Sequence, residues 1–224
     1  MKQMTTRTTT RRDPLATTLP EAITALRLGQ VALVLDDVLD TGCDLVTLAG
    51  VGSASAIATM VRYGSGFLCA TVDSETCRRL DLPPVTWCAD ADDRYVGSMR
   101  VAVDAVAGTT TGISAHDRTR TLAVLADPDT TARHLNRPGH VIPVLAEPLG
   151  VAVTRPNLHG ALATLCEHRS LAFCASLDRG GSGLLDRVEG PALAVIRCSE
   201  ILAAVGDISP RRTATGLLVP PPFC

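Results

Sequence analysis

Short apolar runs alternate with amphipathic segments along most of the chain. Continuous apolar runs bounded by Gly, Pro, Asp or Ser predict buried strands. Apolar residues three or four positions apart, preceded by a capping residue, predict helices. The predicted strands are 31–35, 45–49, 67–72, 101–106, 141–145, 151–154, 171–177 and 193–196, and the predicted helices are 20–28, 53–63, 73–80, 114–126, 157–168 and 199–205. This mixture predicts a layered α/β or α+β domain, with helices packed on a sheet.

Two tails flank one predicted domain. Residues 1–19 are Thr-rich and basic with no apolar period, so we expect a disordered leader. A transit peptide has a similar composition, but this segment lacks an amphipathic apolar face. Residues 20–205 form the single predicted domain. Residues 206–224 form a Pro-rich tail, in which consecutive prolines forbid a helix or a central strand.

Composition and charge exclude several classes of function. Aromatic residues make up 3% of the chain, too few for a surface that stacks the bases of single-stranded nucleic acid. The formal net charge of −2 gives no field that would attract nucleic acid or a membrane. Lys2 is the only lysine, which excludes Schiff-base chemistry on a buried lysine. The eight cysteines form no C-x-x-C pair and no zinc-site spacing, so we expect a cytoplasmic protein with reduced thiols.

The first stretch with candidate chemistry is acidic and covers residues 34–44. An apolar strand runs into four carboxylates, those of Asp36, Asp37, Asp40 and Asp44. Carboxylates at the end of a strand suit a hard cation or proton abstraction. The alternative is a solvated turn that is capped by its own aspartates.

A second stretch, residues 64–69, combines two glycines with Cys69. Glycines allow a backbone to approach a ligand closely. The alternative for Cys69 is a buried cysteine that acts as a small apolar residue.

A third stretch, residues 108–118, has hydroxyl residues between glycines and leads into a predicted helix capped by Ser114. Free N–H groups at a helix start, with the hydroxyls of Thr110 and Thr111, can bind a phosphate, and Arg118 can add charge. An ordinary capped helix start is the alternative, since Asp117 completes a variant of the capping box.

The fourth stretch, residues 136–140, precedes a predicted strand. Arg137 offers two parallel N–H donors for a phosphate or carboxylate, and His140 can bind a metal or transfer a proton. We expect Pro138 and Gly139 to hold both side chains on a rigid turn.

These stretches, in this order, resemble the 3,4-dihydroxy-2-butanone 4-phosphate synthase family of the riboflavin pathway. The most specific matches are residues 110–115 (TTGISA) with Asp117 and Arg118, and residues 137–141 (RPGHV). Weaker matches are residues 34–37, Arg62 with residues 64–66 and Cys69, and residues 80–83. The resemblance covers residues 20–205, nearly the whole predicted domain.

The resemblance implies a layered α/β fold and a homodimer with active sites at the subunit interface. Family enzymes use Mg²⁺ to convert ribulose 5-phosphate into a four-carbon ketone phosphate and formate. With the patterns above, it gives as candidate catalytic residues His140, Asp44, Asp36, Asp37 and Cys69. The candidate substrate-binding residues are Arg137, Thr110, Thr111, Ser114 and Arg118. By the resemblance, His140 is also the candidate metal ligand, and Cys69 stands in the pocket wall.

Two departures from the family pattern concern the metal. The family's acidic loop carries an arginine and two glutamates, one of them a metal ligand; residues 38–44 lack all three, in a loop one residue shorter. A later H-T-E motif is also absent, and residues 157–160 place Gly160 or a neighbour where its catalytic glutamate belongs. Because Mg²⁺ requires oxygen ligands in a near-octahedral array, we expect it to bind weakly at best.

Three functions are open at this point. The first is a diverged lyase of a specialised pathway, which enolises a ribulose 5-phosphate-like or other anionic carbonyl substrate. The second is the ordinary riboflavin-pathway synthase, which releases formate. The third is a non-catalytic binding or scaffold protein.

Overall fold

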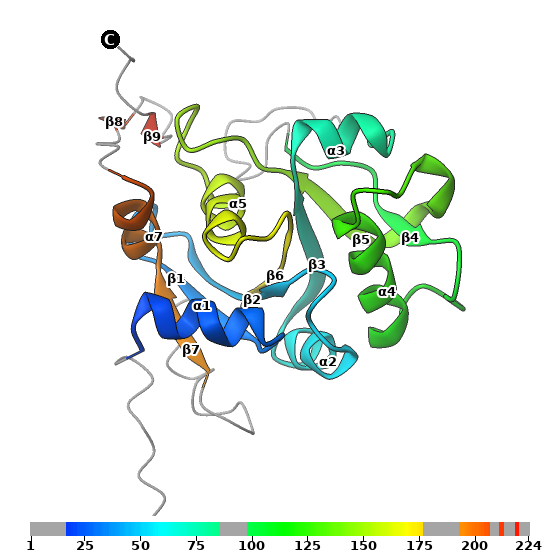
Figure 1. Ribbon diagram of the computed structural model, residues 1–224, viewed down its shortest axis with the longest axis horizontal. Helices are drawn as coiled ribbons and strands as arrows, with labels where there is room; N and C mark the ends of the chain where they lie inside the picture. The colour runs from blue at the N-terminus through cyan, green and yellow to red at the C-terminus, as the bar shows by residue number, and fades with distance from the viewer. Residues whose placement is uncertain (1–16, 86–97, 177–192, 207–210, 213–217, 220–224) are drawn as a thin grey trace, which may run out of the picture.

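A seven-stranded mixed sheet forms the centre of the molecule (Figure 1). The computed structural model describes residues 17–85, 98–176, 193–206, 211–212 and 218–219. The strand order is β4-β5-β3-β6-β2-β1-β7. The strands are β1 (Ala32–Asp36), β2 (Gly42–Leu48), β3 (Gly64–Val72), β4 (Val103–Ala105), β5 (Leu135–Leu145), β6 (Leu171–Ser176) and β7 (Ala194–Arg197). A separate two-stranded ladder pairs β8 (Arg211–Arg212) with β9 (Leu218–Val219).

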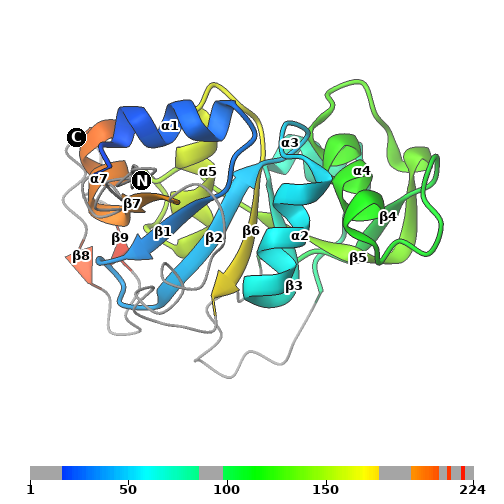
Figure 2. The ribbon, with the colours of Figure 1, turned by 90° about the horizontal axis from the view of Figure 1, so that it is seen from below.

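Helices cover both faces of this sheet, which confirms the predicted layered α/β fold (Figures 1 and 2). One face packs on α1 (Leu19–Arg27), α5 (Arg155–Leu165) and α7 (Cys198–Val205), and the other on α2 (Ala54–Tyr63) and α4 (Ala115–Ala126). A short helix, α3 (Ser74–Arg79), follows β3. Successive strand residues point to opposite faces, so Leu45 and Leu68 lie on the α2 face, whereas Val46 and Cys69 lie on the α5 face.

The helices begin where short polar side chains can accept a backbone N–H. Ser53 accepts from Ala56 (3.1 Å) and Asp73 accepts from Thr76 (2.6 Å), as the sequence predicts. Helix α5 begins two residues before the predicted start, because the Thr154 hydroxyl caps it by accepting the N–H of Asn157 (3.3 Å).

Two local predictions were wrong. Residues 151–154 form no strand of the sheet, because the N–H of Val151 donates to the carbonyl of Pro148 (2.9 Å) and closes a turn. The segment 136–140 is not a turn before a strand, because β5 already begins at Leu135. Gly139 permits this pairing, as a side chain there would overlap the backbone of Val103 on β4.

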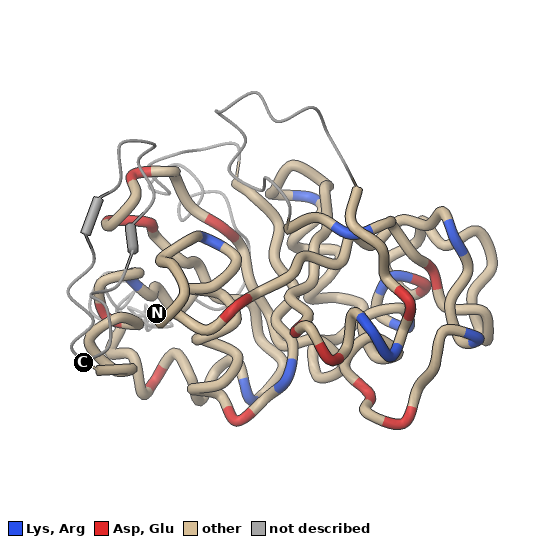
Figure 3. The backbone as a smooth tube through the Cα atoms, turned by 90° about the horizontal axis from the view of Figure 1, so that it is seen from above, with Lys and Arg blue, Asp and Glu red and all other residues tan. Residues whose placement is uncertain are grey.

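The predicted tails fall mostly outside the described residues. Of the leader, only residues 17–19 are described, and the Thr18 side chain caps α1 in a capping box with Glu21. Acidic and basic residues are interspersed along the described backbone, which fits the absence of a field of one sign (Figure 3). Within the described part of the chain, no helix is long and apolar enough to cross a membrane. The cytoplasmic location and the boundaries of the domain stay predictions.

Replacing Leu68 with alanine should destabilise the fold by about 2–5 kcal/mol, because this fully buried side chain leaves a cavity between β3 and α2. Urea denaturation measures the loss. The control is Leu28→Ala, the same change at the C-cap of α1, where the residue is 71% exposed. We expect the control to cost less than about 1 kcal/mol, and equal losses at both positions would contradict the packing described.

Candidate active site

His140 lies inside β5 and is paired with Asp104 on the neighbouring strand β4. Nδ1 of His140 is 2.7 Å from Oδ2 of Asp104, and the His140 backbone N–H donates to Oδ1 (2.9 Å). The carboxylate therefore holds both the ring and the backbone, and a proton on Nδ1 leaves the lone pair on Nε2. The His140 side chain is 38% exposed, so a ligand can reach it.

The hydroxyl-rich loop, residues 108–114, lies directly against this pair. A side chain at Gly112 would overlap the carboxylate of Asp104 and come within 2.7 Å of Nδ1 of His140. The φ of 81° at Gly112 also favours glycine. The loop and the imidazole are therefore in contact, and only a residue without a side chain fits between them.

Asp117, in the first turn of α4, holds the hydroxyl-rich loop in place. Its carboxylate accepts the hydroxyl of Thr110 (3.0 Å) and the N–H of Gly112 (3.1 Å), and its own N–H donates to Ser114 (3.0 Å). Burial raises the pKa of Asp117, but these hydrogen bonds outweigh it and lower the pKa below its usual value. A carboxylate of the protein thus occupies the helix start that the sequence offered as a phosphate site, and Thr111 in the same loop is exposed.

Arg137 and Arg118, the two arginines predicted to bind the substrate, both donate hydrogen bonds to backbone carbonyls. Nη2 of Arg137 donates to the carbonyls of Leu80 and Asp81, just after α3. Arg137 is exposed, so its other N–H groups are accessible to an anion. Arg118 is buried, and its Nη1 donates to the carbonyl of Gly66 (3.0 Å), which ties α4 to β3.

Two of the candidate acids after β1 bind the protein itself. Oδ1 of Asp36 accepts the N–H groups of Val38 (3.2 Å) and Leu39 (2.8 Å), and Oδ2 accepts from the N–H and hydroxyl of Thr41. Asp37 accepts the N–H (2.9 Å) and hydroxyl (2.6 Å) of Ser199 in the first turn of α7. The capped turn that the sequence offered as an alternative therefore describes Asp36, whereas Asp37 caps a helix from a distant part of the chain.

Asp44 forms a buried charge cluster with two residues of α5. Nε of Arg155 donates to Oδ2 of Asp44, and Nε2 of His159 lies 3.2 Å from the same oxygen. Burial alone raises the pKa of Asp44, but the neighbouring His159 and Arg155 outweigh it, so the pKa is lowered. The His159 ring stacks on Phe173, with centroids 4.6 Å apart. Asp44 is 1% exposed and has no direct route to solvent.

Cys69 is a buried core residue rather than an ionised nucleophile. The side chain is 2% exposed and packs on the α5 face of the sheet. Burial, together with the charge of Asp44, raises the pKa of its thiol well above the usual value. The thiolate that nucleophilic catalysis needs is therefore strongly disfavoured.

The described donors do not fit the Mg²⁺ that the resemblance implies. No group of three His, Cys, Asp or Glu side chains among them could hold a metal ion. Ile142 of β5 and Val46 of β2 stand in one row across the sheet with two strands between them. His140 and Asp44, each two residues earlier, therefore lie about 14 Å apart at the backbone. They cannot share an ion whose ligands lie about 2.1 Å away.

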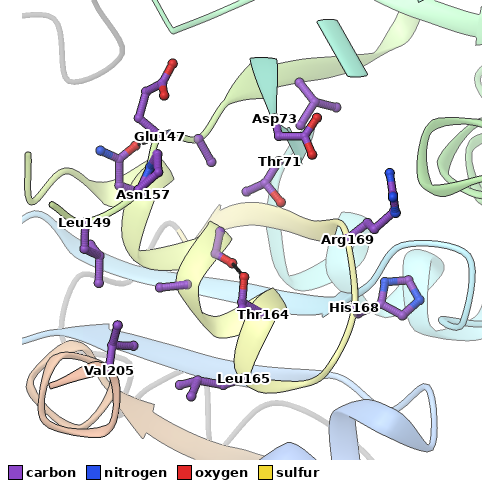
Figure 4. A pocket seen from close by; sticks show the side chains of 15 residues that line it. Thr71, Asp73, Glu147, Leu149, Asn157, Thr164, Leu165, His168, Arg169 and Val205 are labelled. Carbon is purple, nitrogen blue, oxygen red and sulfur yellow. Dashed lines mark hydrogen bonds between the residues drawn. The ribbon is translucent and has the colours of Figure 1, made fainter. Parts of the chain in front are cut away.

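A separate groove of about 570 Å³ lies between α5 and the ends of β3 and β5 (Figure 4). Leu149, Leu165 and Val205 form an apolar side, and the charged Asp73 and Arg169 lie across from them. Gly160 also lines the groove, and a Cβ there would lie 2.7 Å from that of Ala146. Gly160, at or next to the position where the resemblance expects a glutamate, thus lies where α5 packs closely on the chain after β5.

Sequence reasoning missed Asp104, Arg155 and His159 as members of these clusters. Asp104 had a signal, because a carboxylate inside an apolar strand needs a partner. Arg155 and His159 also had one, since their spacing of four residues places them on one helix face. Neither signal identifies the partner, which comes from a distant part of the chain.

The comparisons with known proteins agree with this architecture. A family model described as 3,4-dihydroxy-2-butanone 4-phosphate synthase matches residues 20–183. The chain is 42% identical over 135 residues to the riboflavin biosynthesis protein RibBA of Salinispora tropica. The matched residues make up 60% of this chain and 33% of that protein. It is 33% identical over 176 residues to the 3,4-dihydroxy-2-butanone 4-phosphate synthase of Candida albicans, covering 77% of this chain and 85% of the relative. The chain spans only 32–42% of the length of the RibBA proteins compared with it.

Solved structures give the same result. A 3,4-dihydroxy-2-butanone 4-phosphate synthase in complex with two magnesium ions superposes with a TM-score of 0.73 and 31% identity, covering 84% of this chain and 96% of that one. The synthase of Candida albicans superposes with a TM-score of 0.72 and 26% identity, covering 85% and 98%.

Replacing Arg155 with methionine should destabilise the fold by about 3–5 kcal/mol, because it leaves the carboxylate of Asp44 buried without the guanidinium that donates to it. The double variant Arg155→Met with Asp44→Asn should lose less than Arg155→Met alone, as measured by urea denaturation.

The pH dependence provides a second check on the cluster. Since the folded pKa of Asp44 lies below its ordinary 3.8, the ionised carboxylate contributes stability above that pH and loses it as the pH falls through the folded value. The stability gap between the native chain and Asp44→Asn should therefore shrink on acidification below about pH 4. A gap that widened there would contradict the assignment.

Proposed function

The chain belongs to the 3,4-dihydroxy-2-butanone 4-phosphate synthase family, and from this premise we propose that it is a diverged lyase that enolises a phosphorylated ketose. The substrate class is that of ribulose 5-phosphate, the compound on which the family acts. His140 is the proposed proton carrier, and Asp104 is its positioning residue.

The pairing of His140 with Asp104 is the observation that supports this proposal most. Nε2 of His140 can accept the proton from the carbon next to the substrate carbonyl. The electron pair of that C–H bond then forms a C=C bond, and the π pair of the carbonyl moves to its oxygen, which water protonates. The imidazolium that forms is stabilised by the Asp104 carboxylate, 2.7 Å from Nδ1. Elimination can follow from the resulting enediol when the same imidazolium returns its proton to a leaving hydroxyl, which departs as water. The enediol O–H then loses its proton to water, its electron pair forms a carbonyl, and the C=C pair shifts toward the carbon whose C–O bond breaks.

The polar groups around the pair favour a polyhydroxy anion as the ligand. Thr111 is exposed on the loop that touches His140, and it can bind hydroxyl groups of a sugar phosphate. Arg137, three residues before His140, has exposed N–H donors for the phosphate. Magnesium ions are present in a solved family member, but the donors described here do not fit one, and no step is assigned to a metal.

We also propose the homodimer that the resemblance implies, with its contact near this site. Phe67 and Ile113 are 49% and 57% exposed. Arg118, on the helix that follows Ile113, donates to the carbonyl of Gly66, the neighbour of Phe67 (3.0 Å). This hydrogen bond connects the two segments that carry the exposed side chains. Exposed apolar side chains of this kind beside a functional site favour a subunit contact. Sedimentation of the native chain and of Phe67→Asp tests the dimer.

A non-catalytic binding function is the second candidate. The observation in its favour is that Asp36, Asp37 and Asp44 all bind partners within the protein. Such a protein would bind a sugar phosphate at His140 and Arg137 without turning it over.

Incubation with ribulose 5-phosphate in D₂O separates these functions. The proposed lyase incorporates deuterium at the carbon next to the carbonyl, followed by NMR, and releases no formate above a control without enzyme. Formate release with Mg²⁺ would identify the ordinary synthase. Calorimetric binding without any exchange would favour the second candidate and overturn the enzymatic proposal.

His140→Gln should slow deuterium exchange by about 10²–10⁴-fold, because it removes the proton carrier. Asp104→Asn should slow exchange and shift its pH profile while leaving ligand affinity nearly unchanged, since Asp104 acts through the imidazole. The control is His134→Gln, which changes an exposed histidine on the 3-10 helix Ala132–His134. Equal rates in His140→Gln and the control would remove His140 from the reaction.

Arg137→Ala should weaken binding of ribulose 5-phosphate by about 1.5–3 kcal/mol, the contribution of a hydrogen bond to a charged group. Calorimetry measures the change. Arg133→Ala removes an exposed arginine four residues earlier and controls for net charge. Unchanged affinity in Arg137→Ala would show that the anion binds elsewhere.

A further inference from the structure

We infer that the acidic loop, residues 36–44, has a structural role in this chain and that ligand binding at His140 needs no divalent cation. This inference rests on the proposed function only for the choice of ligand. Four carboxylates of this loop could serve a hard cation by their place in the sequence, namely Asp36, Asp37, Asp40 and Asp44. Asp36, Asp37 and Asp44 are already committed to donors of the protein, which leaves the exposed Asp40, and a single carboxylate is a poor site for Mg²⁺.

The carboxylate of Asp36 has no acceptor capacity left for a metal. It receives four donors: the N–H groups of Val38 and Leu39 on Oδ1, and the N–H and hydroxyl of Thr41 on Oδ2. An ionised carboxylate offers about four lone-pair sites. Binding of a cation at Asp36 would therefore require the turn to open.

Asp37 connects the loop to a helix far away in the sequence. Its two oxygens accept the N–H (2.9 Å) and the hydroxyl (2.6 Å) of Ser199, at the start of α7. A carboxylate at a helix N-terminus is stabilised by the N–H groups that no helical carbonyl accepts. The acidic loop thereby joins β1 to α7.

Arg155 supplies the positive charge at the other end of the loop. Its guanidinium binds the carboxylate of Asp44 through Nε and the carbonyl of Thr41 through Nη1 (3.3 Å). One fixed cation of the chain thus neutralises the buried carboxylate and holds the loop backbone. A divalent ion would have to displace this guanidinium, which is 5% exposed.

His140 cannot replace these ligands alone. Its closest carboxylate, Asp104, binds Nδ1 and the backbone N–H rather than the free Nε2 side. A single imidazole is a poor site for Mg²⁺, which prefers several oxygens in an octahedral array. The cluster at His140 therefore suits proton transfer better than cation binding.

Titration of the metal-stripped full chain with Mn²⁺, followed by electron paramagnetic resonance, tests the inference directly. We expect no saturable site of micromolar affinity. The affinity for ribulose 5-phosphate should differ by less than about twofold between excess EDTA and excess Mg²⁺. A ligand contact through a metal that contributed about 1.4 kcal/mol of binding free energy would instead change the affinity about tenfold.

Matched variants of the loop test its structural role. Asp36→Asn should lower the melting temperature by about 2–8 °C, because an amide nitrogen cannot accept the bonds that close the turn. Asp40→Asn changes the same charge at an exposed position, where φ is 54° and asparagine is tolerated. We expect the control to shift melting by less than about 1 °C.

Two outcomes would overturn the inference. One is a micromolar Mn²⁺ site that disappears in His140→Gln. The other is affinity for ribulose 5-phosphate at least tenfold higher with Mg²⁺ than with EDTA. If ribulose 5-phosphate binds under neither condition, the proposed function fails, but the Mn²⁺ titration and the melting shifts still decide the role of the loop.

Discussion

The buried pair of Asp44 and Arg155 is the interaction on which the rest of this structure depends. It connects strand β2, in the interior of the sheet, with the first turn of α5, inside a face that is otherwise packed with apolar side chains. A charge at this depth is tolerated only with a partner and further hydrogen bonds. Arg155 meets both requirements, because it also binds the carbonyl of Thr41, and this bond sets the course of the acidic loop.

The candidate site lies on the same face of the sheet but about 14 Å away across it. Its central pair, His140 and Asp104, belongs to two adjacent strands, so the sheet itself fixes their separation. Gly112 brings the hydroxyl-rich loop against the pair, and Gly139 brings the two strands together. The geometry of the site therefore depends on two positions where a side chain would collide with its neighbours.

The family fold is retained here, and three carboxylates of the acidic loop bind groups of the protein itself. The chain superposes on synthases with TM-scores above 0.7, and its most specific motifs surround His140. The loop carboxylates, in contrast, close a turn, cap α7 and pair with Arg155. In the function that we propose, the chain keeps proton-transfer chemistry at His140 without the Lewis-acid assistance of a metal.

The sequence by itself determined the layered α/β class, most elements and the helix caps at Ser53, Asp73 and Ser114, because these depend on local periodicity and on side chains that bond three residues away. It also determined the family, through the strings around Thr110 and His140. Only the tertiary structure decided which carboxylates are free to act. Whether an aspartate after a strand binds a ligand or the protein depends on donors that lie far along the chain: Ser199 for Asp37, Arg155 for Asp44, and His140 for Asp104. Burial and charge pairing are properties of the packed molecule, and local sequence carries no record of them.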